Sequence, residues 1–174
     1  MKNDLEGLVQ VYTGNGKGKT TAALGLGMRA IGHGYKVCMI QFLKPKNTYG
    51  EHNSVKKKNF KIKSYGINDF ATPKTRENYK KLSKKAFNYA AKTVMSGKYD
   101  VVILDEINFA AAYGYVKLDD IIRLIEQKPK TVELVLTGRD APEKIIEKAD
   151  LVTIMQELKH PYKKGIPARK GIEY

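Results

Sequence analysis

The chain has 174 residues, of which 42% are hydrophobic, and it carries a formal net charge of +14. This length allows one domain with a well-buried core and is too short for two ordinary domains. All apolar runs are shorter than the ~20 residues of a membrane helix, and a single cysteine, Cys38, excludes an internal disulfide. The first residues lack the apolar segment of a secretory signal. We therefore expect a cytoplasmic protein.

The positive charge favours anionic partners such as nucleotides, nucleic acids or acidic surfaces. The lysines are scattered along the chain, which favours a solvated lysine-rich surface over a nucleic-acid groove. The sequence has no RNA- or DNA-binding motif. We expect neither a nucleic-acid nor a membrane partner, and a basic nucleic-acid-binding module is the second alternative function.

The apolar pattern predicts strands that alternate with helices along the whole chain. In chain order the predicted elements are a strand at 8–12, a helix at 19–31, strands at 36–42 and 60–65, a helix at 76–95, a strand at 101–104, helices at 108–113 and 118–127, a strand at 132–137, a helix at 142–148 and a strand at 151–155. This alternation indicates an α/β fold with a mostly parallel sheet and helices on both faces. We expect a single domain over 1–174, in which 157–174 form a polar C-terminal tail.

A glycine-rich segment lies between the first predicted strand and the first predicted helix. It reads Gly14-Asn15-Gly16-Lys17-Gly18-Lys19-Thr20-Thr21. Glycines let backbone N–H groups close around phosphate oxygens, Lys19 would reach phosphate charge, and the Thr20 hydroxyl would hold Mg²⁺. The first glycine comes one residue later than usual, because Thr13 occupies its usual position. The strand before and the helix after favour a nucleoside triphosphate site over a flexible turn.

An acidic pair, Asp105 and Glu106, directly follows the apolar run at 101–104. In a phosphate-loop protein one such carboxylate completes the magnesium shell, directly or through water, and the other orients a reactant. This pattern alone is weak, but it is strong when it follows a phosphate loop in the same α/β chain.

Loops that follow strand C-termini line the ligand crevice in open α/β sheets. Glu51 and His52 lie in the loop after the second strand, so they are candidates for substrate contact, although ordinary loop polarity explains them nearly as well. Arg139 follows the strand at 132–137 and could bind phosphate or a carboxamide, or form only a surface ion pair.

Blocks along the whole chain resemble the P-loop ATP:corrinoid adenosyltransferases, from about residue 7 to the end. The late-starting glycine loop is itself the form found in that family. The similar blocks are Val9 to Thr21, Gly32-His33-Gly34, Val37, Gln41-Phe42, Gly50-Glu51, Leu104-Asp105-Glu106-Ile107-Asn108, Thr137-Gly138-Arg139, Ala149-Asp150-Leu151-Val152-Thr153, Lys159-His160-Pro161-Tyr162 and Gly171-Ile172-Glu173-Tyr174.

This resemblance implies a P-loop NTPase-like (RecA-like) domain with a particular reaction. The Co(I) of a reduced corrinoid attacks the 5′ carbon of ATP, forms an adenosyl–cobalt bond and releases triphosphate, in adenosylcobalamin biosynthesis or salvage. It also implies Mg²⁺, an external electron donor such as a flavoprotein, and a homodimer. The corrinoid could be cobalamin, cobinamide or cobyrinic acid diamide.

The resemblance also implies roles for individual residues. Residues 14–21 would bind ATP, and Lys19, Thr20 and Glu106 would be catalytic. Thr20 and Glu106 would hold magnesium, with Asp105 as an outer partner or alternative ligand. The residues expected to line the corrinoid crevice are Glu51, Phe70, Tyr79, Tyr113 and Arg139.

One departure concerns the corrin contact. The family often has a Trp near the position of Thr75, whereas this chain has no Trp, and Phe70 or Tyr79 could take that role. The first alternative function is a P-loop ATPase or kinase that acts at the γ-phosphate. It would need an acceptor site with a residue that orients water or a hydroxyl, and the sequence indicates none.

Overall fold

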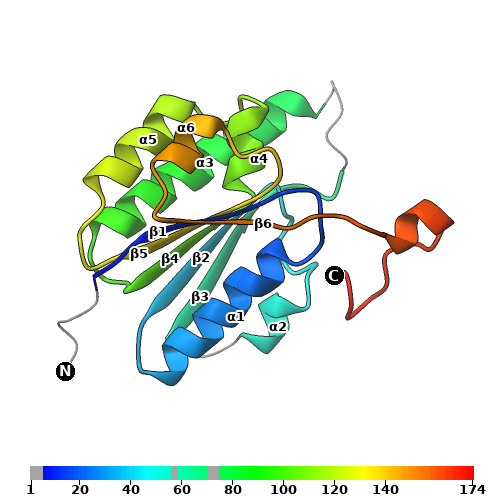
Figure 1. Ribbon diagram of the computed structural model, residues 1–174, viewed down its shortest axis with the longest axis horizontal. Helices are drawn as coiled ribbons and strands as arrows, with labels where there is room; N and C mark the ends of the chain where they lie inside the picture. The colour runs from blue at the N-terminus through cyan, green and yellow to red at the C-terminus, as the bar shows by residue number, and fades with distance from the viewer. Residues whose placement is uncertain (1–5, 56–58, 70–74) are drawn as a thin grey trace.

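The computed structural model describes residues 6–55, 59–69 and 75–174. Within them, all the strands pair in parallel in one six-stranded sheet of order β3-β2-β4-β5-β1-β6 (Figure 1). This confirms the predicted parallel α/β sheet. The strands are β1 (Val9–Thr13), β2 (Val37–Phe42), β3 (Phe60–Tyr65), β4 (Val101–Asp105), β5 (Glu133–Thr137) and β6 (Leu151–Ile154).

Helices cover both faces of the sheet, as the alternating pattern predicted. Helices α1 and α2 lie on one face, and α3, α4, α5 and α6 lie on the other (Figure 1). Their bounds are α1 (Lys19–Gly32), α2 (Glu51–Ser54), α3 (Arg76–Met95), α4 (Ile107–Ala112), α5 (Leu118–Gln127) and α6 (Glu143–Glu147). The short α2 was not predicted, since its first three residues fall in the segment 43–53, which was expected to be a loop.

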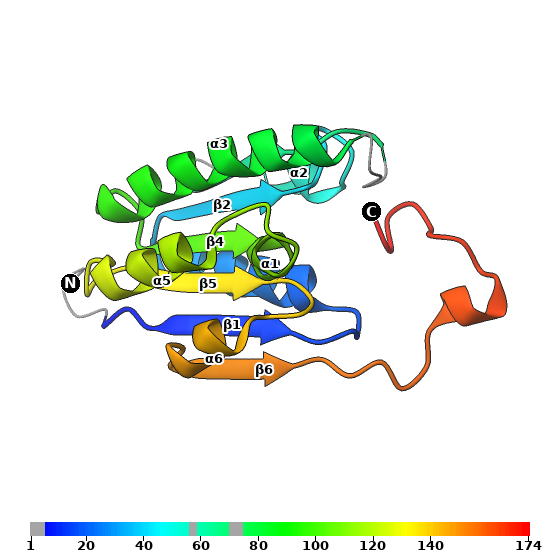
Figure 2. The same ribbon diagram turned by 90° about the horizontal axis from the view of Figure 1, so that it is seen from above.

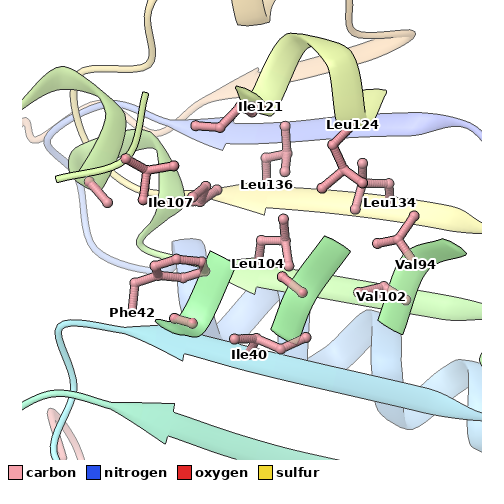
Figure 3. Close-up of a cluster of buried hydrophobic side chains, with 14 of the residues drawn as sticks. Ile40, Phe42, Val94, Val102, Leu104, Ile107, Ile121, Leu124, Leu134 and Leu136 are labelled. Carbon is pink, nitrogen blue, oxygen red and sulfur yellow. The ribbon is translucent and has the colours of Figure 1, made fainter. Parts of the chain in front are cut away.

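Strand β2 shows why the core has two halves. All six of its residues are buried, and successive side chains of a strand point to opposite faces. Ile40 and Phe42 pack toward α3 and α4 (Figure 3), whereas Met39 belongs to the cluster under α1. Each fully buried side chain of this kind contributes roughly 1.5–3 kcal/mol. The strand therefore joins both helix layers to one sheet.

Close packing of α1 on the sheet depends on small residues. Ala23 is fully buried, and a Cβ added at Gly27 would lie 2.6 Å from the Phe60 ring. The Ala- and Gly-rich composition of this helix thus lets its backbone approach the sheet closely. Because α1 leads directly from the glycine-rich segment, this packing fixes the position of that segment at the sheet's carboxyl edge.

The C-terminal part of the chain is far more exposed than the rest. All four residues of the edge strand β6 are exposed. The chain then runs beyond the carboxyl ends of the strands, forms a 3₁₀ turn at Pro161–Lys164 and comes back toward that edge (Figure 2). Within the described residues, none of the helices has both the length and the apolar character needed to cross a membrane.

Candidate active site

The glycine-rich segment joins β1 to α1 and folds around its own lysine. Gly14 and Gly18 have φ values of 93° and 120°, which glycine adopts readily and other residues avoid. The Lys19 ammonium donates hydrogen bonds of 2.7 Å to the carbonyl oxygens of Gly14 and Gly16. Burial lowers the pKa of Lys19, while the charge of Glu106 opposes this shift. A cationic group is therefore held at the centre of the loop.

A cavity of about 670 Å³ opens over this loop at the carboxyl edge of the sheet. It brings together the glycine-rich segment, the loops after β2, β4 and β5, and the C-terminal residues. The residues that line it include Asn15, Gly16, Lys17, Gly18, Lys19, Thr20, Thr21, Lys44, Tyr49, Glu51, Glu106, Arg139, Gly171, Ile172, Glu173 and Tyr174. All residues expected to bind nucleotide lie here except Gly14, whose carbonyl oxygen accepts a hydrogen bond from Lys19.

The Asp105 carboxylate is the central polar group below the cavity. Its side chain is 0% exposed. Its Oδ1 accepts hydrogen bonds of 2.9 Å from the Thr20 hydroxyl and 2.7 Å from the Thr137 hydroxyl. Its Oδ2 lies 2.8 Å from the Lys44 ammonium. Residues from α1, β5 and the loop after β2 therefore meet at one buried carboxylate.

A row of polar side chains extends from Asp105 across the neighbouring strands. Gln41 of β2 is in register with Asp105 of β4 and with Ser64 of β3. The Ser64 hydroxyl and the Gln41 amide are hydrogen-bonded at 2.8 Å, and the Gln41 Nε2 donates to Glu51 Oε1 at 2.8 Å. His52 Nε2 lies 2.7 Å from Gln41 Oε1. This row holds Glu51 at the cavity wall.

Glu106 lies at the start of α4 in an unusual backbone conformation. Its φ of 65° is in the left-handed region, which is rare for a residue with a side chain and is often found at functional sites. Its backbone N–H donates to Thr137 Oγ1 at 3.1 Å. Burial, followed by the charge of Asp105, raises the pKa of Glu106. This carboxylate lines the cavity, whereas Asp105 lies beneath it.

The oxygen atoms of Thr20, Asp105 and Glu106 are hard donors of the kind that Mg²⁺ prefers. Thr20 and Asp105 are in direct contact, and Glu106 faces the same cavity. Among the described residues, groups of three or more His, Cys, Asp or Glu side chains that could hold a metal by themselves are absent. The donor set thus fits a magnesium ion that a nucleotide holds jointly with the protein.

The residues expected to contact a corrinoid are placed differently from one another. Glu51 and Arg139 line the cavity. Tyr79 is 4% exposed, and its hydroxyl donates to the carbonyl oxygen of Asp69. Tyr113 is 49% exposed and stacks on Phe109 with ring centroids 4.1 Å apart. Neither tyrosine belongs to the described residues that line the cavity, and Phe70 lies outside the described residues.

Two parts of the site were not anticipated from the sequence. Lys44 is one lysine among many, and only its place just after a buried strand could have indicated its role. The C-terminal residues were expected to be a tail, yet the Lys17 ammonium lies 2.8 Å from Glu173 Oε1 and donates to the Ile172 carbonyl oxygen at 3.1 Å. Hydrogen bonds from Arg169 and Lys17 lower the pKa of Glu173 to about 2.

Comparison with known proteins extends over nearly the whole chain. Residues 5–174 match the family described as ATP:corrinoid adenosyltransferase BtuR/CobO/CobP. The corrinoid adenosyltransferase of a Sinorhizobium species is 37% identical over 99% of this chain and 83% of its own length. That of Escherichia coli K12 is 33% identical over 98% of this chain and 87% of its own length.

Two further similarities concern a third enzyme and a solved structure. Corrinoid adenosyltransferase CobA of Salmonella typhimurium is 32% identical over 97% of this chain and 86% of its own length. The genome packaging NTPase B204 of Sulfolobus turreted icosahedral virus 2 matches with a TM-score of 0.48 and 15% identity, over 86% of this chain and 74% of that one. With the family match over residues 5–174 and three relatives above 30% identity, the chain belongs to the ATP:corrinoid adenosyltransferase BtuR/CobO/CobP family.

Proposed function

We propose that this protein transfers the 5′-deoxyadenosyl group of ATP to the Co(I) of a corrinoid and releases inorganic triphosphate. The observation that carries this proposal is the glycine loop around Lys19, beside the Thr20–Asp105 contact, in a chain that matches the adenosyltransferase family over residues 5–174. The site offers charge stabilisation for a triphosphate leaving group, and the family supplies the identity of the acceptor.

The chain's own residues act in this proposal mainly by binding and positioning. Lys19 exchanges the carbonyl oxygens of Gly14 and Gly16 for phosphate oxygens, and the loop N–H groups add further donors. When bound at Thr20, Asp105 and Glu106, magnesium would neutralise charge on the triphosphate. Fixed donors of this kind stabilise developing charge, and holding two reactants in line removes ~7–11 kcal/mol of barrier. A general base is unnecessary because the nucleophile is the cobalt.

The acceptor is proposed to approach the cavity from the side of Glu51 and Arg139, which line its wall. We further propose that an external electron donor such as a flavoprotein supplies the reduced corrinoid, and that the enzyme is a cytoplasmic homodimer. Tyr79 and Phe70 are proposed to contribute to the corrin side of the site. For Tyr79 this contribution is indirect, since its hydroxyl binds the backbone of Asp69, next to Phe70.

The decisive experiment is anaerobic visible spectroscopy of reduced corrinoid with Mg-ATP, with and without the protein. The spectrum should change from that of Co(I) to that of an adenosylated corrinoid only when the protein is present, and triphosphate should accumulate in equal amount. ADP and phosphate as products would contradict the proposal and favour attack at the γ-phosphate. Cobalamin, cobinamide and cobyrinic acid diamide can be compared in the same assay.

A further inference from the structure

Lys44 is a buried cation at the candidate metal site that the reaction described above does not use. It follows β2 and comes directly after Leu43, whose φ of 62° is in the left-handed region. Its side chain is 13% exposed. The ammonium lies 2.8 Å from Asp105 Oδ2, donates to Thr20 Oγ1 at 3.1 Å, and lies 4.9 Å from the centre of the Tyr49 ring.

Acidic side chains surround the Lys44 ammonium. The ammonium pairs with the Asp105 carboxylate, and the carboxylates of Glu51 and Glu106 line the same cavity. The group is therefore a cation held by the two residues, Thr20 and Asp105, that are in direct contact within the metal donor set.

The hydrogen bonds at Thr20 show why this position is special. The hydroxyl donates its single hydrogen to Asp105 Oδ1, so the oxygen lone pairs face the other way. The Lys44 ammonium donates to that oxygen, and a metal ion bound at Thr20 would use the same lone-pair side. Asp105 Oδ2, the second oxygen available to a cation, is also taken by Lys44. Only one cation at a time can therefore bind both Thr20 Oγ1 and Asp105 Oδ2.

We propose that Lys44 is an internal counter-ion of the metal site, which magnesium displaces when Mg-ATP binds. Without metal, Lys44 stays on Thr20 and Asp105 and supplies the positive charge that a bound triphosphate needs. With metal, the ammonium leaves these oxygens but remains in the wall of the same cavity. Lys44 is thus a positioning residue that decides how strongly ATP binding depends on magnesium.

An ordinary structural ion pair would not show all of these features. Such a pair needs only Lys44 and Asp105, whereas here the ammonium also binds the hydroxyl that a phosphate loop offers to a metal. Leu43, directly before Lys44, has a φ of 62°, in the left-handed region that residues with side chains rarely adopt and that is often found at functional positions. The neighbouring Lys46, on the same loop, is exposed and does not line this cavity.

The test measures ATP binding by titration calorimetry, in excess Mg²⁺ and in excess EDTA, without corrinoid. The measured quantity is the ratio of the Kd in EDTA to the Kd in Mg²⁺. Lys44→Met should raise this ratio by at least about tenfold. In EDTA, the triphosphate loses the positive charge of Lys44, whereas in Mg²⁺ the metal ion no longer competes with the ammonium for Thr20 and Asp105. Lys46→Met is the matched control and should leave the ratio within about twofold of wild type, because its charge is exposed. An unchanged ratio in Lys44→Met overturns the proposal.

A measurement on the wild-type protein covers the case in which Lys44→Met does not fold. With ¹⁵N-labelled lysine, the buried Lys44 ammonium should give a solvent-protected NMR signal in nucleotide-free protein, assigned by its absence in Lys44→Arg. The signal should persist with ATP in EDTA and disappear or shift with Mg-ATP. A signal that is the same in all three states overturns the proposal.

This inference rests on the proposed function only for Mg-ATP binding, and the corrinoid plays no part in the experiment. Wild-type protein that binds no ATP in either buffer would overturn both proposals. ATP binding with the expected change of ratio, but without formation of an adenosylated corrinoid, would support the role of Lys44 and contradict adenosyl transfer.

Discussion

Two lysine–carboxylate pairs of the same length lie at the cavity, and they differ in burial. Lys44 and Asp105 are 2.8 Å apart, with side chains 13% and 0% exposed. Lys17 and Glu173 are also 2.8 Å apart, with side chains 47% and 23% exposed. Exposed pairs contribute little because water and salt screen them, whereas breaking a buried pair leaves an uncompensated charge. The distance alone therefore says little about what each pair does.

The difference suits two tasks in one site. In the buried pair, the hydroxyls of Thr20 and Thr137 hold the Asp105 carboxylate through its Oδ1, so the carboxylate can stay in place when the cation at Oδ2 changes. The exposed pair holds the C-terminal residues to the loop that is proposed to receive phosphate, so under that proposal it has to open readily. We expect a cavity that binds and releases a nucleotide to combine a fixed carboxylate beneath it with C-terminal residues that are held only weakly at its wall.

The largest effect is expected at Lys19, a buried lysine that binds carbonyl oxygens rather than a carboxylate. Lys19→Ala should reduce the rate of adenosyl transfer by at least about a thousandfold, because a fixed donor to the leaving triphosphate is lost. Its circular dichroism spectrum and melting temperature should stay close to wild type. Lys98→Ala, which removes an exposed lysine, is the control. Wild-type turnover in Lys19→Ala would contradict the assignment of the loop.

The next effect sharpens the contrast between the two pairs. Asp105→Asn leaves the Lys44 ammonium buried without its carboxylate, so the free energy of unfolding should fall by about 3–5 kcal/mol. Asp120→Asn breaks a third ion pair, the exposed one between Asp120 and Arg123 away from the cavity, and should cost less than about 1 kcal/mol. Urea unfolding of the metal-free proteins measures both changes. Equal losses of unfolding free energy in the two variants would contradict the view that burial determines how much an ion pair matters for stability.

The alkylation rate of Cys38 on β2 reports how readily the sheet beneath the site opens to solvent. It is fully buried, and burial raises the pKa of its thiol to about 11. The thiolate is the reactive form, so at pH 8 this shift alone should slow alkylation about a hundredfold relative to unfolded protein. The labelling rate should rise with pH until about pH 11, because deprotonation increases over that range. Labelling at pH 8 as fast as that of unfolded protein would show that the sheet opens readily.

The smallest effect is expected at Glu173. Glu173→Gln should change the Kd for Mg-ATP by less than about fivefold, and the difference from wild type should shrink further at high salt. The same substitution should not alter the labelling rate of Cys38, because the C-terminal residues are not part of its surroundings in the core. A change in the Kd for Mg-ATP of more than about tenfold would contradict the view that this exposed pair contributes little to nucleotide binding.

Local sequence patterns determined most of the framework. The helices at 76–95 and 118–127 were predicted with their observed bounds, because apolar residues recur at the helical period and Ser96 or Pro129 follows the end. The glycine loop and the Asp105–Glu106 pair were located from sequence motifs that, in this order within one α/β chain, are specific for a nucleotide site. Such features depend on residues that are close together in the sequence, so the sequence alone is enough to predict them.

Contacts between distant segments decided the rest. Tyr79 has the helical spacing of either a core or a binding residue, and only packing against Tyr115 placed it in the core. The meeting of Lys44 with Thr20 and Asp105 joins three segments that the parallel sheet brings to one edge. The return of Glu173 to Lys17 spans 156 positions of the chain. The physical reason is that a side chain's partner across the sheet depends on strand order and register, which local periodicity does not encode.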